Sequence, residues 1–164
     1  MEFDRSGLEV LGPGECRDLL RHAEVGRIVF THNALPAVQP VNYVLDGEDI
    51  VFRTSESSRL ATAATGAIVA FEIDDFDTDA QTGWSVVAVG PARRVSAPGQ
   101  IAALENAELR TWAPGQRDQF IRVRPEMLSG RRISGGPGVA LNGGVQVGGL
   151  QHEDDKGTVL GQTE

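Results

Sequence analysis

The sequence predicts a mainly β protein, built as a small antiparallel barrel of six strands with short helices at its periphery. Three observations support this prediction. About six segments are rich in the β-branched and aromatic residues that favour strands. Most links between these segments are too short for the crossover connections of a parallel sheet. The pair Asp46-Gly47, between two of the segments, favours the positive φ angle of a tight hairpin turn.

The first predicted element is a short helix. In residues 15–25, apolar side chains recur at i, i+3, i+4 and i+7, which is the spacing of one helical face. Cys16 lies on that face, and we expect it to be a small core residue. Gly26 is expected to end the helix, and residues 26–31 are then predicted to form the first strand.

Two further strands are predicted to form the hairpin, at residues 37–45 and 49–54. Pro40 lies within the first of them and has no N–H to donate, which predicts an edge position or a bulge. The second strand is apolar except near its end, where Arg53 follows Phe52. An arginine at this place needs a reason.

The second half of the chain continues the same alternation of short strands and helices. In order, it is predicted to contain a helix (55–65), a strand (66–74), a polar loop (75–82) and a long strand (83–95). A segment that starts as a loop and becomes a helix (97–112) and a strand that runs into a turn (118–128) are predicted to follow. The long strand is expected to bend at Gly90-Pro91. In the last strand, Phe120 and Arg122 alternate with Ile121 and Val123, which is typical of a half-buried strand.

The chain is therefore expected to have one folded domain, at residues 1–133, and a tail. Residues 134–164 are rich in Gly and polar side chains and have no sustained hydrophobic period. Such a composition is typical of flexible segments, so we predict a flexible Gly-rich C-terminal tail.

Composition restricts the classes of partner. The 164-residue chain has a net charge of −8, which disfavours a general nucleic-acid or membrane-surface role but permits a local basic site. Its single cysteine allows no intrachain disulfide. The N-terminal residues lack the layout of a signal peptide, and no apolar run reaches the roughly 18 residues of a membrane span. We therefore expect a cytoplasmic protein.

Familiar catalytic and metal motifs are not found in the sequence. It contains no dinucleotide-binding glycine motif and no P-loop. Asp75, Asp77 and Asp79 match the first ligands of a calcium loop, but Ala80 and Val86 stand where Gly and Glu are required. The three histidines do not have the spacing of metal ligands. No metal site is therefore predicted.

The segment from Arg53 to Arg59 has the components of a phosphate site. A helix is predicted to begin near Ser58, and a helix start offers free N–H groups. Guanidinium groups match phosphate oxygens with two parallel donors. The alternative is that Arg53 and Arg59 pair with surface carboxylates of an acidic protein, and the pattern alone does not separate the two.

A series of short runs, in their order and spacing, resembles a known family. The runs are GRIVF (26–30), QPVNYV (39–44), IVFRT (50–54), SSRL (57–60), VAFEID (69–74), GWSVVAVGPA (83–92) and SGRRI (129–133). They resemble the pyridoxamine 5′-phosphate oxidase-like family of FMN-binding split barrels. The resemblance is strongest to the branch of nitroimidazole-reductase-like and actinobacterial flavin and deazaflavin proteins. It covers roughly residues 8–133 and implies a split β-barrel fold.

The resemblance implies which residues hold the phosphate of the flavin. The matching pairs are Arg53-Thr54 and Ser58-Arg59. Members of the family often have Lys where this chain has Arg59, and the substitution keeps the positive charge.

The resemblance also implies which residues approach the flavin ring. The strand matching Val41-Asn42-Tyr43 lies along the ring and offers hydrogen bonds to it. The segment matching Trp84-Ser85 comes near the flavin, often from the other subunit. Two alternatives stay open. Asn42 is equally suited to a cross-strand bond, and for Trp84 a strand position favours core or dimer packing over a flavin contact. Trp112, in the final predicted helix, is interpreted as a packing residue.

Taken together, the sequence predicts an FMN-binding oxidoreductase that acts on an unidentified small molecule. The family's usual assembly predicts a homodimer with flavin at the interface. Whether the protein is an enzyme stays open, because no general acid or base stands out. The alternatives are a deazaflavin-dependent reductase on the same fold, a non-enzymatic flavin- or haem-binding protein, and a dimeric interaction module without a cofactor. The Gly-rich tail replaces the Arg- and His-bearing C-terminal segment of pyridoxamine phosphate oxidases, so that specific activity is not expected.

Overall fold

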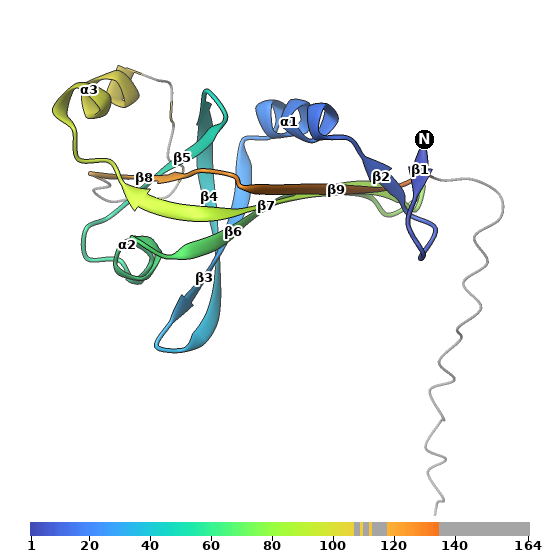
Figure 1. Cartoon of the computed structure of the whole chain (residues 1–164), viewed down its shortest axis with the longest axis horizontal. Helices are drawn as coiled ribbons and strands as arrows, with labels where there is room; N and C mark the ends of the chain where they lie inside the picture. Colours follow the sequence, from blue (N-terminus) through green and yellow to red (C-terminus); the bar gives the residue numbers. More distant parts are fainter. Residues whose placement is uncertain (107–108, 110–111, 113–117, 135–164) are drawn as a thin grey trace, which may run out of the picture.

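The computed structural model describes residues 1–106, 109, 112 and 118–134 (Figure 1). Within this part of the chain it places nine strands in one sheet, together with three helices. The strands are β1 (Glu2–Phe3), β2 (Glu9–Leu11), β3 (Val25–His32), β4 (Leu35–Asp46), β5 (Asp49–Thr54), β6 (Ile68–Asp77), β7 (Thr82–Arg94), β8 (Gln119–Val123) and β9 (Met127–Ile133). The helices are α1 (Pro13–His22), α2 (Arg59–Ala64) and α3 (Pro98–Asn106).

Six of the strands close into an antiparallel barrel. The sheet order is β1-β2-β9-β7-β6-β3-β4-β5-β8, and an additional pairing of β7 with β8 joins its two parts. The closed ring is therefore β7-β6-β3-β4-β5-β8, while β9, β2 and β1 extend the sheet from β7. The predicted mainly β fold, a six-stranded antiparallel barrel with short helices, is confirmed.

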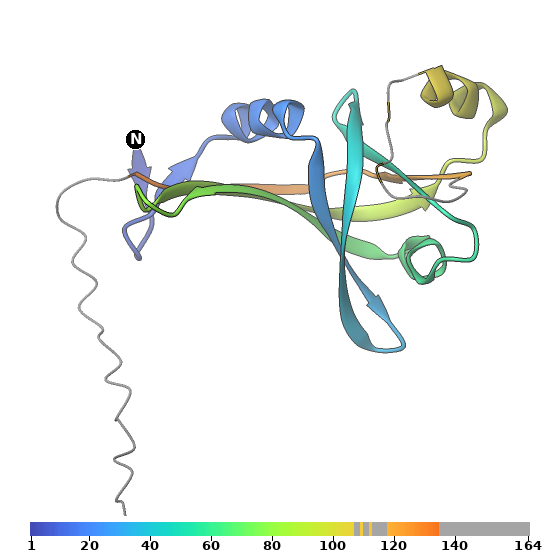
Figure 2. The ribbon, with the colours of Figure 1, turned by 180° about the vertical axis from the view of Figure 1, so that it is seen from behind.

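Two long strands change partners part-way along their length and so divide the barrel into two sheets. Strand β4 pairs with β3 up to Asn42 and with β5 from Tyr43 onward. Strand β7 pairs with β9 up to Val89 and with β8 from Ala92 onward. Because β3 meets β6 at three residue pairs near its start, the rest of the β3–β4 hairpin projects beyond its neighbours (Figure 2).

The change of partner in β7 depends on a glycine. The predicted bend at Gly90-Pro91 lies where the corner between β8 and β9 crosses β7, with Arg124 N donating to Pro91 O and Glu126 N to Val89 O. A Cβ atom on Gly90 would lie 1.9 Å from the carbonyl oxygen of Arg124. Any side chain there would push the two backbones apart.

The main core fills the barrel and is covered at its ends by helices. α1 contributes Cys16, which is 1% exposed, as the sequence predicted for a core residue. α2 contributes Leu60 and Ala64, both fully buried. A second, smaller cluster lies under α3, on the outer face of β5 and β8. Its buried members are Val51, Val95, Leu104, Leu109 and Phe120.

Several predicted boundaries are wrong. The helix expected at residues 15–25 begins at Pro13 and ends at His22, because Ala23 already has extended backbone angles. The polar loop expected at 75–82 is shorter, since β6 and β7 stay paired as far as Asp77 and Thr82 and leave residues 78–81 as the turn. The strand expected to run into a turn within residues 118–128 ends at Val123. Strands β1 and β2, and most of β9, were not predicted.

Two local expectations have different outcomes. Strand β8 is buried on both faces rather than half-buried, because the second cluster covers the side that carries Phe120. Pro40 does lie at a local edge, since β4 has β3 as its one strand partner at that point in the described chain. The predicted tail from residue 134 lies almost wholly outside the described residues.

Candidate functional site

Arg53 lies on the outer face of β5, pointing away from the barrel core. Its neighbours Phe52 and Thr54 are buried in the barrel, so alternation along the strand directs Arg53 outward. Across the sheet it is paired with Phe120 of β8. The Arg53 Cζ atom lies 4.9 Å from the centroid of the Phe120 ring, which is cation–π geometry.

The guanidinium of Arg53 is partly buried without a counter-ion. Its Nε atom is inaccessible to solvent and has no hydrogen-bond acceptor within the described chain. A buried donor without a partner is costly, so such groups call for an explanation. No described carboxylate forms an ion pair with Arg53 or Arg59. An anionic ligand would satisfy these donors.

Arg122 on the same face of the sheet shows what a neutralised arginine looks like. It lies two residues from Phe120 along β8, and its terminal nitrogens donate to Asp49 Oδ2, at 3.0 Å, and to Asp46 Oδ2. Burial works to lower the pKa of Arg122, but these two carboxylates outweigh it and the net shift is upward. One outward arginine is therefore part of an ion-pair network and the other is not.

Thr54 and Ser58 join the end of β5 to the start of α2. Their hydroxyl oxygens are 2.8 Å apart, and Ser58 Oγ also accepts a hydrogen bond from Ala61 N at 2.9 Å. Ser58 is thus the N-cap of α2, as a serine at a helix start favours. Thr54 is 1% exposed, so its hydroxyl serves this cap rather than the surface. The bond brings Arg53-Thr54 and Ser58-Arg59 together, with Arg59 exposed at the first position of α2.

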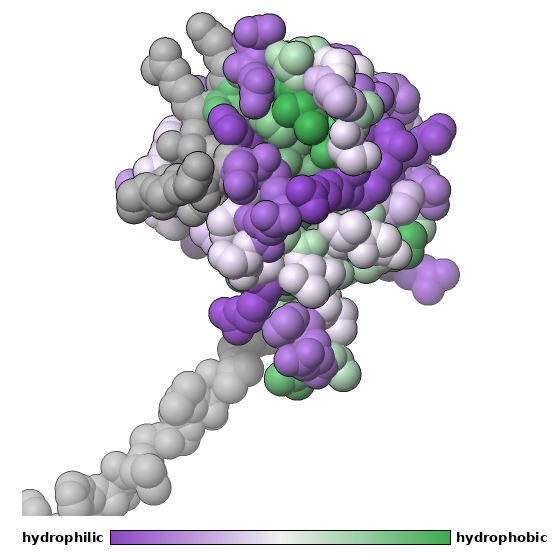
Figure 3. Space-filling view, turned by 90° about the vertical axis from the view of Figure 1, so that its left-hand side faces the viewer, coloured by the Kyte–Doolittle hydropathy of each residue, from purple (hydrophilic) through white to green (hydrophobic). Residues whose placement is uncertain are grey.

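This end of the molecule carries a mixed surface. Figure 3 shows a hydrophobic patch at the level of α3, with a hydrophilic band crossing the face below it. Arg94, at the end of β7, is engaged by Glu56 at 3.5 Å. Arg59 has no such partner in the described chain, so its charge faces solvent.

Val41, Asn42 and Tyr43 of β4 point to alternate sides. Val41 and Tyr43 are buried in the main core, whereas Asn42 is on the outer face. Asn42 Oδ1 accepts from the backbone N of Trp112 at 3.0 Å, and its Nδ2 lies 3.5 Å from the carbonyl oxygen of Glu24. The amide of Asn42 therefore links β4 to two other segments.

The hydroxyl of Tyr43 is committed to the end of α1. It donates to Leu20 O at 2.7 Å, and the ring meets Phe71 edge to face with centroids 4.8 Å apart. Burial raises the pKa of the Tyr43 phenol well above its usual range. Along this strand, contacts to a ligand are left to the backbone and to Asn42.

A cavity of about 630 Å³ lies beside this strand. It is lined by Leu20, Arg21, Ala23, Glu24, Asn42, Tyr43, Val44, Leu45, Leu109 and Trp112. Trp112 is 68% exposed, so its interpretation as a packing residue is wrong. Residues on α1 and Trp112 were not predicted for a site, because sequence spacing does not show that they meet β4.

Trp84 and Ser85 lie at the opposite end of the sheet within one chain. Trp84 lies eight positions before Ala92, where β7 meets β8, which is about 26 Å along an extended strand. Trp84 packs against the main core from its edge. One chain therefore does not bring these two residues to Arg53.

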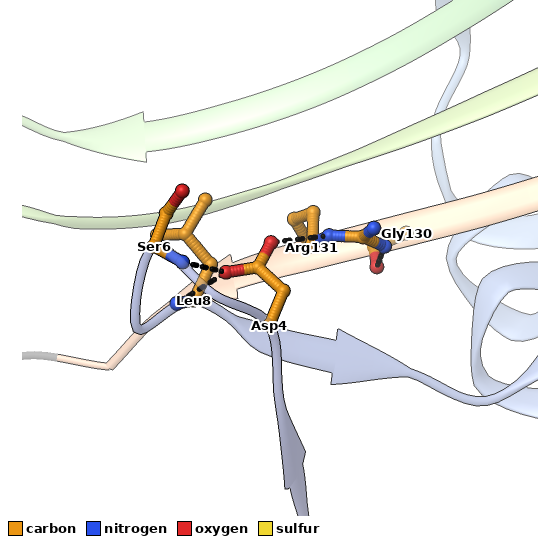
Figure 4. A network of polar contacts seen from close by, with 5 residues as sticks. All are labelled: Asp4, Ser6, Leu8, Gly130 and Arg131. Atoms are coloured by element: carbon orange, nitrogen blue, oxygen red, sulfur yellow. Dashed lines mark hydrogen bonds and ion pairs between the residues drawn. The ribbon is translucent and has the colours of Figure 1, made fainter.

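The strand pair next to Ser85 is held by an N-terminal contact. Ser85 is paired with Arg131 of β9, whose Nε donates to Asp4 Oδ2 at 2.8 Å (Figure 4). Asp4 Oδ1 accepts from the backbone N of Ser6 and of Leu8. The hydrogen bond from Leu8 is the largest of several that lower the pKa of the Asp4 carboxyl. Asp4 and Arg131 therefore neutralise each other's charge within this network.

Within the described ranges, no group of three or more His, Cys, Asp or Glu side chains is placed to hold a metal ion. No helix in that part of the chain is long and apolar enough to cross a membrane.

Comparison with known proteins decides the family. A family model described as pyridoxamine 5′-phosphate oxidase matches residues 13–132. The chain belongs to this family. The resemblance that the sequence predicted is therefore confirmed.

The chain is also similar to individual proteins from Mycobacterium and Corynebacterium. The uncharacterized protein Rv0080 of Mycobacterium tuberculosis is 37% identical over 124 residues, covering 73% of this chain and 81% of its own. The structure of the FAD binding protein from Mycobacterium smegmatis is 36% identical with a TM-score of 0.64, covering 75% and 96% of the two chains. A conserved protein of unknown function, DIP1874 from Corynebacterium diphtheriae, is 28% identical with a TM-score of 0.66, covering 77% and 98%.

Proposed function

We propose that this protein binds FMN, holds the phosphate of the flavin with Arg53 and Arg59, and acts as an oxidoreductase on a small molecule. The observation that carries the proposal is the guanidinium of Arg53, which is partly buried with no carboxylate partner in the described chain. A phosphate monoester fits it, because guanidinium groups offer paired donors and Arg59 adds a second charge. Membership of the family is the reason for proposing a flavin as the ligand that carries this phosphate.

The protein's own residues would bind and orient the cofactor. Arg53 and Arg59 would hold the phosphate, and Asn42 would face the ring. The Thr54–Ser58 hydrogen bond joins the two residues next to these arginines. A bound flavin supplies the electron or hydride transfer, while the protein supplies position and electrostatics.

FAD is the second candidate cofactor. The reason is the 36% identity to a protein described as FAD binding, over 96% of that protein's length. FAD shares the flavin and its first phosphate with FMN, so Arg53 and Arg59 would serve either one.

We further propose that the working unit is a homodimer with flavin at the interface. A row of apolar side chains crosses five neighbouring strands on the outer face of the sheet. In register order it is Val38, Val29, Ala70, Val89 and Met127. Val38 and Met127 are 62% and 68% exposed. Among the buried helix residues, Cys16, Leu20, Leu60, Ala64 and Leu104 pack in the two core clusters. A second copy would cover this row and could bring its Trp84 toward the flavin.

Cofactor binding is tested by absorbance spectra of the purified protein after adding FMN or FAD and removing free ligand. We expect about one flavin per chain. A charge-assisted contact contributes about 1.5–3 kcal/mol, so Arg53→Ala and Arg59→Ala should each weaken binding by roughly tenfold or more. Arg17→Ala is the charge-matched control, because Arg17 is already paired with Glu48 on the surface.

The same spectra contain the outcomes that contradict the proposal. Unchanged flavin retention in both arginine variants would reject the phosphate site. Retention of haem or of a deazaflavin cofactor instead of flavin would favour the alternative functions. Holo-protein whose flavin is not reduced by nicotinamide donors would favour a flavin-binding protein without that activity.

A further inference from the structure

Phe120 forms the surface on which the guanidinium of Arg53 lies. The two residues are direct partners across β5 and β8, so their side chains leave the sheet on the same face. The distance from Arg53 Cζ to the ring centroid is 4.9 Å, within the range in which an aromatic face attracts a cation. The contact is thus set by strand register rather than by surface chance.

The ring itself is held in place by the second cluster. Phe120 is 1% exposed and packs with Val51, Leu104 and Leu109. Interiors packed in this way hold side chains in single rotamers, so the ring has little freedom to turn away. A fixed ring gives Arg53 a fixed platform.

An aromatic platform orients an arginine without using its donors. Arginine carries five N–H donors, and a carboxylate partner would occupy some of them and neutralise the charge. Arg122, two residues from Phe120 along β8, shows this outcome, because its terminal nitrogens donate to Asp46 and Asp49. The Nε atom is buried without a partner in both arginines. In Arg122 the terminal nitrogens are bound by carboxylates, whereas in Arg53 no described side chain accepts a hydrogen bond from them. The ring holds the cation and leaves its donors for an anion.

We propose that Phe120 is the positioning residue of the phosphate site, orienting Arg53 for the flavin phosphate through its aromatic face. The inference rests on the proposed flavin-phosphate role of Arg53. It adds a residue from a distant part of the chain that acts through Arg53 rather than by touching the ligand.

The test compares FMN with riboflavin, which has the same ring and ribityl chain but no phosphate. Dissociation constants are measured by flavin fluorescence for the full chain and for Phe120→Leu, which keeps the cluster apolar. We expect FMN binding to weaken about fivefold, the equivalent of losing a cation–π contact of roughly 1 kcal/mol. Riboflavin binding should not change, because it does not use Arg53.

Leu104→Val is the matched control. Leu104 belongs to the same cluster, on α3, and its truncation loosens the packing without removing the ring. This variant should keep the FMN-to-riboflavin affinity ratio of the unaltered protein. If both affinities fall together in Phe120→Leu, or if the ratio falls equally in Leu104→Val, Phe120 is a packing residue and the inference is wrong.

A second variant keeps the test decisive if Phe120→Leu does not fold. Pentafluorophenylalanine at position 120 preserves the shape of the ring but reverses the charge distribution over its face. It should unfold near the temperature of the unaltered protein and still lose affinity for FMN relative to riboflavin. An unchanged ratio in this protein would overturn the inference.

Arg53→Ala separates failure of the inference from failure of the proposed function. If Arg53→Ala lowers the FMN-to-riboflavin ratio and the Phe120 variants do not, the phosphate site stands and the positioning role falls. If Arg53→Ala leaves the ratio unchanged, the proposed phosphate role of Arg53 is rejected, and the inference falls with it.

Discussion

At the scale of single residues, Tyr43 offers a direct probe of the packing between β4 and α1. It is the single tyrosine of the chain, and its hydroxyl donates to Leu20 O at 2.7 Å. A hydrogen bond of this kind contributes about 1 kcal/mol, so Tyr43→Phe should lower the free energy of unfolding by that amount at neutral pH. Urea unfolding of the two proteins measures the difference, and the ring contact with Phe71 is the same in both.

The pH dependence of that contribution has a defined sign. Burial raises the pKa of Tyr43 in the folded state, while the unfolded phenol titrates near pH 10. Stability from the neutral phenol is therefore complete below about pH 10 and is lost as the pH rises above it. Tyr43→Phe should remove this loss. Tyrosinate absorbance that develops near pH 10 in protein that is still folded would contradict the burial of this hydroxyl.

Residues also mark the limit of what the sequence could predict about the site. The chemistry of Arg53, Arg59 and the Ser58 cap follows from residue type and from a strand running into a helix. The partner of Arg53 does not, because Phe120 lies 67 positions away in the sequence and its contact depends on the β5–β8 register. Asn42 could be recognised as a polar residue needing a partner, but its bond to Trp112 depends on the tertiary fold.

At the scale of elements, the crossing of β7 by the β8–β9 corner is the most restricted packing in the barrel. Gly90→Ala would place a Cβ atom 1.9 Å from Arg124 O, a backbone atom that cannot rotate away. We expect a loss of about 1–3 kcal/mol or more in the free energy of unfolding, measured by chemical denaturation. Gly99→Ala in α3 is the control, because a methyl group added there would meet no atom within 4 Å outside its own helix backbone and chain neighbours. It should change stability by about 0.5 kcal/mol or less.

The elements divide in a similar way between what was predictable and what was not. Hydrophobic periodicity located the barrel strands, and Gly90-Pro91 indicated the bend, because both signals are local. Strands β1, β2 and β9 have weak local sequence signals and form because each pairs with a neighbouring strand. For example, β9 pairs with β7, and β2 with β9. The burial of β8 depends on α3 lying over it, which strand alternation does not reveal.

At the scale of the whole molecule, the placement of the predicted flavin residues argues for two chains. Arg53 lies where β5 meets β8, while Trp84 lies at the far end of β7 beside β9. One chain does not bring them together, so a flavin contacted by both would need a second copy. The apolar row from Val38 to Met127 provides a face for it, flanked by Arg27, which is already paired with Glu72 and Asp74. Burying an arginine that already has carboxylate partners costs less free energy than burying an unpaired charge.

The dimer is tested by placing a charge at the centre of that row. Ala70 lies mid-row on β6, and Ala70→Glu would add a carboxylate beside Glu72 on the face that the second copy would cover. We expect the unaltered protein to have the mass of two chains by light scattering and Ala70→Glu the mass of one, since a buried unpaired charge opposes association. Ala102→Glu, the same substitution on the exposed side of α3, should leave the dimer intact.

If the flavin lies at the interface, Ala70→Glu should also lose FMN while Ala102→Glu keeps it. A dimeric Ala70→Glu protein would reject this face as the interface. A monomeric variant that retains FMN would instead place the flavin within one chain and leave Trp84 to packing.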